Sequence, residues 1–69
     1  MKFDYSKLLG LMRERGMTQQ NLADKLHISI STLNKKLHNL NEFTQTEIVG
    51  ICKILNIRLQ DVTEYFFAH

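Results

Sequence analysis

The chain has 69 residues, of which 43% are hydrophobic and none is proline, and this size and composition predict one helical domain over residues 1–69. Cys52 is the one cysteine, so we expect no internal disulfide bond, in keeping with a cytoplasmic protein. No apolar run approaches the roughly 20 residues of a membrane span, so we expect neither a signal peptide nor a membrane partner. The net charge of +2 is unevenly distributed along the chain. Residues 1–41 carry seven Lys and Arg against three acids (+4), whereas residues 42–69 carry two Lys and Arg against four acids (−2). This distribution favours binding of a polyanionic partner by the first half of the chain.

The first predicted helix opens at Phe3 and Asp4 and ends at Gly16. Asp4 can cap the helix, Phe3 can pack onto Leu8 one turn later, and Gly16 can adopt the left-handed conformation that stops a helix. The apolar periodicity predicts a buried stripe formed by Tyr5, Leu8, Leu9 and Met12.

Two short helices are predicted next, from about Thr18 to Leu26 and from about Ser29 to Leu37. The hydroxyl groups of Thr18 and Ser29 can each accept a hydrogen bond from a backbone N–H one turn later. The joint consists of His27, Ile28 and Ser29. The apolar face of the first helix is formed by Leu22, Ala23 and Leu26, and the buried edge of the second by Leu33 and Leu37.

The opposite side of the second short helix carries short or polar side chains, namely Ile30, Ser31, Asn34 and Lys35. So short a connection between helices is typical of the helix-turn-helix, whose second helix lies in the DNA major groove. Amide, hydroxyl and ammonium groups suit the edges of bases. We predict base contacts in which Asn34 binds an adenine, Lys35 a guanine and Ile30 a thymine methyl group, with Ser31 beside them.

A family resemblance accompanies this pattern. At their mutual spacing, the following residues resemble the helix-turn-helix of phage repressors and Cro-type regulators: Gln19, Leu22, Ala23, Leu26, Ile28, Ser29 and Leu33. The resemblance extends from Asp4 to about Tyr65. It implies an all-α, five-helix, lambda-repressor-like DNA-binding domain, with the motif at helices 2 and 3, that acts in the bacterial cytosol as a homodimer on a near-palindromic operator.

The chain departs from the family pattern at three places. His27 stands where the family usually has a glycine, although histidine tolerates a left-handed backbone better than most residues. Lys36 stands at a usually apolar position, where its stem can pack while its ammonium reaches solvent or phosphate. Met12 and Leu37 replace a buried Arg–Glu pair of some phage repressors, and we therefore expect them to touch.

A second group of residues is predicted to bind DNA phosphates. For Gln19 this role is implied by the family resemblance. Ser29 can contact phosphate besides capping its helix, whereas Lys36 and His38 would add affinity without reading sequence. Asn39 and Asn41, in the loop over residues 38–42, are phosphate donors in one interpretation; in the other they only tolerate loop dihedrals.

The fourth helix is predicted from about Gln45 to Leu55, after a capping box formed by Thr44 and Glu47 and with Phe43 packed onto Ile48. Asn56 can end it in a left-handed conformation. The core stripe of this helix consists of Ile48, Ile51, Cys52 and Leu55. A last short helix is predicted from about Leu59 to Phe67, and the residues expected to face the core are Leu59, Val62 and Phe66.

The consecutive aromatic residues Tyr65, Phe66 and Phe67 are predicted to form the dimer contact. Neighbouring residues on a helix point about 100° apart, so at least one of the three should be exposed. An exposed aromatic side chain near the end of a small domain suggests a contact surface. The alternative is that all three cover the edge between the first and fourth helices.

Other chemistry is not expected. The spacing of His27, His38, His69 and Cys52 matches no zinc pattern, so we predict no metal and no cofactor. Paired carboxylates and a glycine-rich loop are missing, so we predict neither an enzyme nor a small-molecule substrate. The alternative is a protein-interaction module, an antitoxin or an adaptor, but no acid occurs from Ser29 to Asn41 and this favours DNA. We therefore predict a Cro-like, phage-type repressor of transcription.

Overall fold

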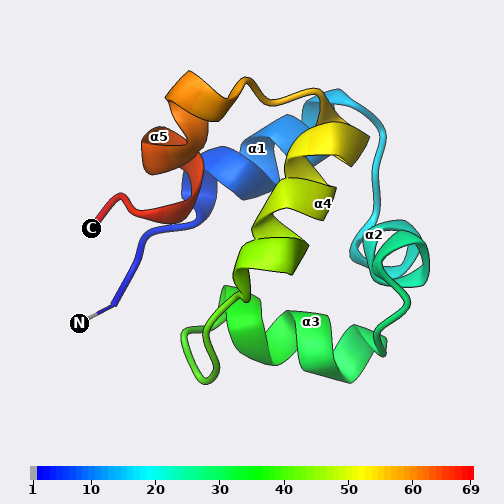
Figure 1. Ribbon diagram of the computed structural model, residues 1–69. Helices are drawn as coiled ribbons and strands as arrows, with labels where there is room; N and C mark the ends of the chain where they lie inside the picture. The colour runs from blue at the N-terminus through cyan, green and yellow to red at the C-terminus, as the bar shows by residue number, and fades with distance from the viewer. Residues whose placement is uncertain (1) are drawn as a thin grey trace.

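The computed structural model describes residues 2–69, and within that range the chain forms five α-helices and one 3-10 turn and no β-strand (Figure 1). The predicted all-α class with five helices is confirmed. The elements are α1 (Ser6–Glu14), α2 (Gln19–Leu26), α3 (Ile30–Leu37), α4 (Gln45–Leu55), the 3-10 turn η1 (Leu59–Asp61) and α5 (Val62–Phe66). None of the helices described is long and apolar enough to cross a membrane.

Helix α4 forms the centre of the arrangement. In Figure 1 it runs down the middle, with α3 lying across its lower end and α1 and α5 packed together at the upper left. Helix α2 contacts both α3 and α4. The view looks nearly along the axis of α2 while α3 lies across it, so these two helices cross steeply. Their connection is as short as predicted, since only residues 27–29 separate them.

All five helices contribute to one apolar core. The largest fully buried side chains are Leu8, Leu22, Leu33, Ile51, Leu55 and Phe66. Met12 and Leu37 are both buried in this cluster, and the expectation that they touch each other stays a prediction. Gly50 lets α4 approach α2 closely, because a Cβ atom there would lie 3.1 Å from Cδ2 of Leu26.

Two predictions about burial are wrong. Leu11 is buried in α1 whereas Leu9 is only half-buried, because α5 packs against the Leu11 side of α1 and Tyr65 lies beside Leu11. Leu59 is 75% exposed instead of facing the core. The reason is that residues 59–61 form a 3-10 turn, so the helical register that would direct Leu59 inward starts only at Val62.

The predicted caps of three helices are confirmed. The hydroxyl groups of Thr18, Ser29 and Thr44 accept hydrogen bonds at 3.0–3.1 Å from the backbone N–H three residues later. The caps of α2 and α4 are complete capping boxes, closed by the side chains of Asn21 and Glu47. Asp4 lies one residue too early, since α1 begins at Ser6, yet its carboxylate still accepts a hydrogen bond of 2.9 Å from the Ser6 N–H.

Helices α1 to α4 each stop at a residue with a left-handed backbone. The following N–H bonds back to a carbonyl five residues earlier at 2.8–3.1 Å, which closes the helix end. The four stopping residues are Gly16 (φ 65°), His27 (φ 59°), Asn39 (φ 63°) and Asn56 (φ 57°). The predictions for Gly16, His27 and Asn56 are confirmed. Because three of the four are not glycine, their side chains are available for other contacts.

The left-handed positions 27 and 39 give the first testable prediction. His27→Gly should raise the free energy of unfolding by about 0.5–1 kcal/mol, because glycine removes the cost of a Cβ at positive φ. Asn39→Gly is the matched comparison. It should lower the free energy of unfolding by about 1–2 kcal/mol, because two side-chain hydrogen bonds of 2.8 Å to the backbone of Phe3 are lost. Thermal and urea unfolding followed by circular dichroism measures both, and a shift of both variants in the same direction would contradict this account.

Candidate nucleic-acid interface

The outer face of α3 presents the residues predicted to read bases. Leu33, Lys36 and Leu37 face the protein interior. The exposed positions on the other side are Ile30, Ser31, Asn34, Lys35 and His38. Their spacing of one, three, one and three residues forms a single stripe along the helix. Figure 1 shows α3 along the lower border of the molecule, with its neighbours on the other side, so this stripe is accessible along its whole length.

Gln19 joins the start of α2 to this stripe. The Asn34 Nδ2 group donates to Oε1 of Gln19 over 3.4 Å, which links side chains 15 positions apart in the sequence. The bond uses the amide oxygen of Gln19, so its Nε2 group keeps both hydrogens for a ligand. The same bond orients the Asn34 amide. The structure thus brings together a predicted phosphate contact and a predicted base contact.

Both side-chain hydrogen bonds of Ser29 are formed with Thr32 of α3. Its Oγ accepts from the Thr32 N–H at 3.0 Å and donates its proton to Oγ1 of Thr32 at 2.8 Å. A hydroxyl group has a single proton to donate, and here that proton is already bound within the protein. The structure therefore supports the capping role of Ser29 and gives no support to its predicted phosphate contact.

The prediction that the ammonium of Lys36 reaches solvent or a DNA phosphate is wrong. The Lys36 side chain is only 9% exposed, and its Nζ lies 2.6 Å and 2.8 Å from the two carboxylate oxygens of Glu47. Glu47 is also the capping-box residue of α4, so the carboxylate binds Lys36 and the N–H of Thr44 at once. Lys36 thus holds α3 to the start of α4 and is removed from the phosphate-binding set.

Asn39 also has a structural task instead of the predicted one. Its side-chain amide forms two hydrogen bonds of 2.8 Å with the backbone N–H and C=O of Phe3, 36 positions away. Its φ of 63° also ends α3. Both interpretations of the sequence miss this contact, because it depends on two segments that meet only in the fold. Asn41 in the same loop is exposed and stays available.

The clamp between Asn39 and Phe3 brings another cation near the end of α3. Lys2 is exposed and directly precedes Phe3, so it is held beside the loop that follows α3. No local sequence signal indicates this placement. Two other basic residues are already paired with acids, since Lys7 forms an ion pair with Glu64 and Arg58 forms one with Asp61.

The ring of His38 is oriented by α3 itself. Its Nδ1 lies 2.8 Å from the carbonyl oxygen of Asn34, and since a carbonyl only accepts, Nδ1 carries the proton in this bond. In the neutral tautomer Nε2 is then an acceptor, and only the imidazolium form offers an Nε2–H to a phosphate.

The three C-terminal aromatic residues lie in three different environments. Phe66 is only 1% exposed and belongs to the core, so its predicted dimer contact is wrong. Tyr65 is half-buried, with the Lys7 ammonium 5.3 Å from its ring centre. Phe67 is 43% exposed and packs edge-to-face against Phe3. The expectation that at least one of the three is exposed is confirmed.

The cysteine and the possible metal-ligating side chains of residues 2–69 lie in separate places. Cys52 is a buried core residue, as its position in the periodicity predicts, and burial raises the pKa of its thiol. In the described part of the chain, no three His, Cys, Asp or Glu side chains lie close enough to hold a metal ion.

Comparison with known proteins places the chain in a family. The model of the family described as "Protein of unknown function (DUF739)" matches residues 1–69, and the chain therefore belongs to this family. No curated protein matches the sequence. Because that description names no activity, we infer the function from the geometry of α2, α3 and the loop after them.

The contact between Lys36 and Glu47 predicts a pH dependence of stability. Burial by itself would raise the pKa of Glu47, but hydrogen bonds from Lys36 and Thr44 outweigh it and hold the pKa below the ordinary value of 4.5. The unfolded chain therefore takes up this proton first, so the stabilisation is complete above about pH 4.5 and is lost as the pH falls through the folded pKa. Glu47→Gln should cost about 1–3 kcal/mol at pH 7, and less at about pH 3.

Urea unfolding of both proteins across this pH range measures the difference. Asp4 also has a lowered pKa, caused by side-chain and backbone hydrogen bonds from Ser6, but it is present in both proteins and cancels in the comparison. A cost of Glu47→Gln that stays the same at every pH would contradict the assignment.

Proposed function

We propose that this member of the DUF739 family is a sequence-specific, double-stranded-DNA-binding regulator of transcription, with α3 as its recognition helix. The observation that carries the proposal is the exposed stripe formed by Ile30, Ser31, Asn34 and Lys35 on a helix whose other side is buried. A helix presented in this way, after a three-residue connection from a steeply crossing partner, has the shape that enters a major groove.

In this proposal, each exposed residue of α3 has a contact suited to its chemistry. Asn34 presents an amide to the N6 and N7 of adenine, Lys35 an ammonium to a guanine, and Ile30 its apolar surface to a thymine methyl group. Ser31 binds either kind of edge through its hydroxyl. Because the hydrogen bond that Asn34 donates to Gln19 orients the Asn34 amide, Asn34 is the residue best prepared for specific recognition.

Phosphate contacts in the proposal come from both ends of the stripe. Gln19 offers its free Nε2 group at the start of α2. Past the end of α3 lie Asn41 and His38, whose Nε2 can donate to a phosphate only in the imidazolium form, together with Lys2 on the clamped N-terminal segment. These groups would fix the position of the domain on the duplex without reading its sequence.

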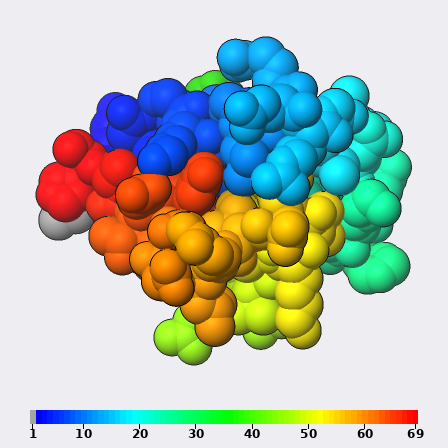
Figure 2. All heavy atoms as spheres, turned by 90° about the horizontal axis from the view of Figure 1, so that it is seen from above, coloured from blue at the N-terminus to red at the C-terminus, as the bar shows by residue number. Residues whose placement is uncertain are grey.

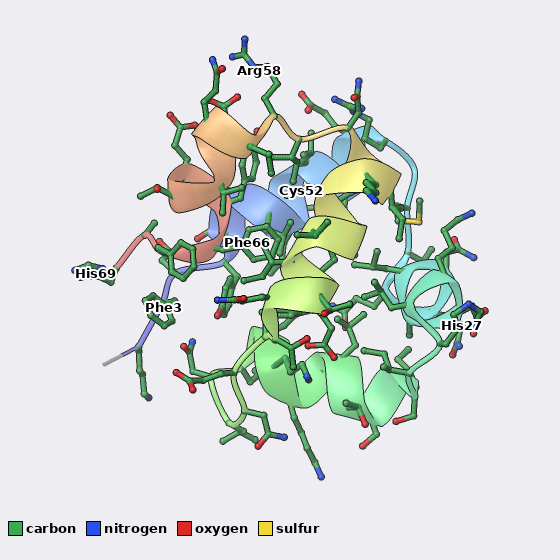
Figure 3. The ribbon with its side chains drawn as sticks, viewed as in Figure 1. Phe3, His27, Cys52, Arg58, Phe66 and His69 are labelled. Carbon is green, nitrogen blue, oxygen red and sulfur yellow. The ribbon has the colours of Figure 1, made fainter. Side chains whose placement is uncertain are left out.

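We further propose that the protein acts as a homodimer on an approximately two-fold symmetric operator. In such a dimer both recognition helices must face the same side, so the dimer contact lies beside α3 and not opposite it. Phe67 (43% exposed) and Leu40 (71% exposed) meet this condition, because the C-terminal segment and the loop after α3 lie on one flank in Figure 1. Leu59 does not, because it directly follows Arg58, which Figure 3 shows at the end of the molecule opposite α3. Figure 2, seen from above, shows the orange-coloured atoms around residue 60 on the near face.

The regulatory outcome we propose is repression of a phage-type promoter, because a bound dimer excludes polymerase from the DNA that it covers. The protein needs no catalytic group or cofactor for this action. The competing function is a protein-interaction module with the same fold, and Ile30, which is 43% exposed on α3, would then be a partner contact. The experiment below separates these two functions.

Selection from random duplex DNA tests the proposal directly. Retained fragments should share a near-palindromic site, and binding should weaken steeply as the salt concentration rises. Asn34→Ala and Lys35→Ala should each weaken binding to that site by about 1–3 kcal/mol, or roughly 5- to 150-fold. Lys53→Ala is the matched control, because it removes an exposed cation from the last turn of α4, far from α3, and should leave affinity nearly unchanged.

Two results would refute DNA recognition by α3. One is unchanged affinity in both the Asn34 and the Lys35 variants. The other is weak binding without enrichment of any sequence, which would favour the protein-interaction module.

The dimer contact is tested by charge insertion at three exposed apolar positions. Phe67→Glu and Leu40→Glu should shift the sedimentation of the protein–DNA complex from a dimer towards a monomer, because a carboxylate opposite its own symmetry mate is repelled and poorly hydrated. Leu59→Glu is the control and should sediment like the wild type. Disruption by Leu59→Glu alone would place the contact on the other face and remove the two-fold argument.

A further inference from the structure

A cavity of about 150 Å³ lies between the two chain ends, the loop before α4 and α4 itself. Five aromatic residues, one aliphatic residue and one acidic residue line it, namely Phe3, Tyr5, Phe43, Phe66, Phe67, Ile48 and Glu42. Figure 3 shows Phe3 on the flank near the two chain ends and Phe66 further inside, towards α4. The contacts that we assigned to DNA binding leave this cavity unexplained.

The rings around the cavity are mutually tilted or perpendicular. Phe43 packs edge-to-face with Tyr5 and with Phe66 at centroid distances of 5.4 Å and 5.7 Å, and Phe3 packs in the same way with Phe67 at 5.8 Å. Because the paired rings are nearly perpendicular, the five aromatic residues that line the cavity do so in several orientations. The face of an aromatic ring carries negative electrostatic potential.

One acidic residue adds to this potential. Glu42 is among the residues that line the cavity, whereas no Lys, Arg or His is among them. Tyr5 is only 6% exposed, and its side chain lines the cavity beside Phe43. The pKa of Tyr5 is raised by burial and, to a smaller extent, by the negative charge of Glu42, which places the two groups near each other.

We infer that this cavity is a binding site for a small organic cation, an ammonium ion with short alkyl groups. Ring faces attract such a cation, and one carboxylate without a competing basic side chain supplies its counter-charge. The volume matches in size an apolar protein cavity of about 150 Å³ that holds a benzene molecule, so a ligand of a few heavy atoms fits. An anion would meet both the ring faces and Glu42 with the wrong sign.

Choline and its uncharged isostere 3,3-dimethylbutan-1-ol form a matched pair of probes. Titration of the isotope-labelled protein, at constant ionic strength and at a concentration where sedimentation shows one species, is followed by the amide signals of residues 42, 43 and 67. Choline should give saturable shifts there and bind about tenfold more tightly than the alcohol, because only choline gains the attraction of the ring faces and the carboxylate. Equal affinity of the two probes, or no saturable shift with choline, would overturn the proposal.

Variants assign the binding to the cavity. Glu42→Gln should weaken choline binding about five- to tenfold, whereas Glu14→Gln removes an exposed carboxylate on α1 and should not change it. Phe67→Leu keeps an apolar wall but removes a ring face, and should weaken choline binding about threefold without weakening the alcohol. Loss of binding in Glu14→Gln, or none in Glu42→Gln, would contradict the site.

A partner protein could present the same chemistry on a methylated lysine side chain. A short peptide with one trimethyl-lysine, titrated beside choline, distinguishes this source. Equal or weaker binding of the peptide supports a free small cation, and binding more than tenfold tighter would replace it with a partner's side chain. The titrations contain no DNA, so their outcome does not depend on whether α3 reads bases.

Discussion

The bonds of the Glu47 carboxylate fix the orientation of α3 relative to α4. This carboxylate caps α4 through the N–H of Thr44 and at the same time holds the ammonium of Lys36 at 2.6 Å and 2.8 Å. An ion pair this far from water contributes little net stability, but loss of one partner leaves a costly unpaired charge. The pair therefore acts mainly as a selector of geometry. Any rotation of α3 about its axis that hides Asn34 and Lys35 also pulls Lys36 away from Glu47.

This use of Lys36 changes the electrostatics of the proposed interface. A sequence count assigns both lysines of α3 to the DNA, whereas the structure leaves Lys35 exposed and neutralises Lys36 internally. Fewer free cations mean a smaller sequence-independent contribution to affinity. Discrimination between sequences then depends more on the hydrogen-bonding groups of Asn34 and Ser31, and affinity more on the second copy in a dimer.

Local chemistry explains which features of this fold are predictable from the sequence. The caps at Thr18, Ser29 and Thr44 and the stops at Gly16, His27 and Asn56 depend on residues within one or two helical turns, and all are confirmed. The failures involve distant partners: Lys36 meets Glu47 across a loop, and Asn39 meets Phe3 36 positions away. Periodicity also cannot show which neighbour covers a helix, which is why Leu11 and Leu59 differ from expectation. Phe66 faces the core as the periodicity predicts, and only its assignment to the dimer contact fails. For the candidate site, sequence spacing was enough to group the exposed residues of α3, but not to tell a free polar group from one already bound.

The loop from Asn39 to Phe43 is where the three proposed surfaces meet. Asn39 clamps the N-terminal segment, Leu40 belongs to the proposed dimer contact, Asn41 belongs to the proposed phosphate contacts, and Glu42 and Phe43 line the aromatic cavity. Helix-ending bonds at Asn39 and the capping box at Thr44 fix both ends of this loop. A ligand that displaces Glu42 or Phe43 therefore acts within a five-residue segment that also carries Leu40 and Asn41. The proposed cation site and the proposed DNA and dimer contacts thus share one short segment, and the fold fixes both ends of that segment.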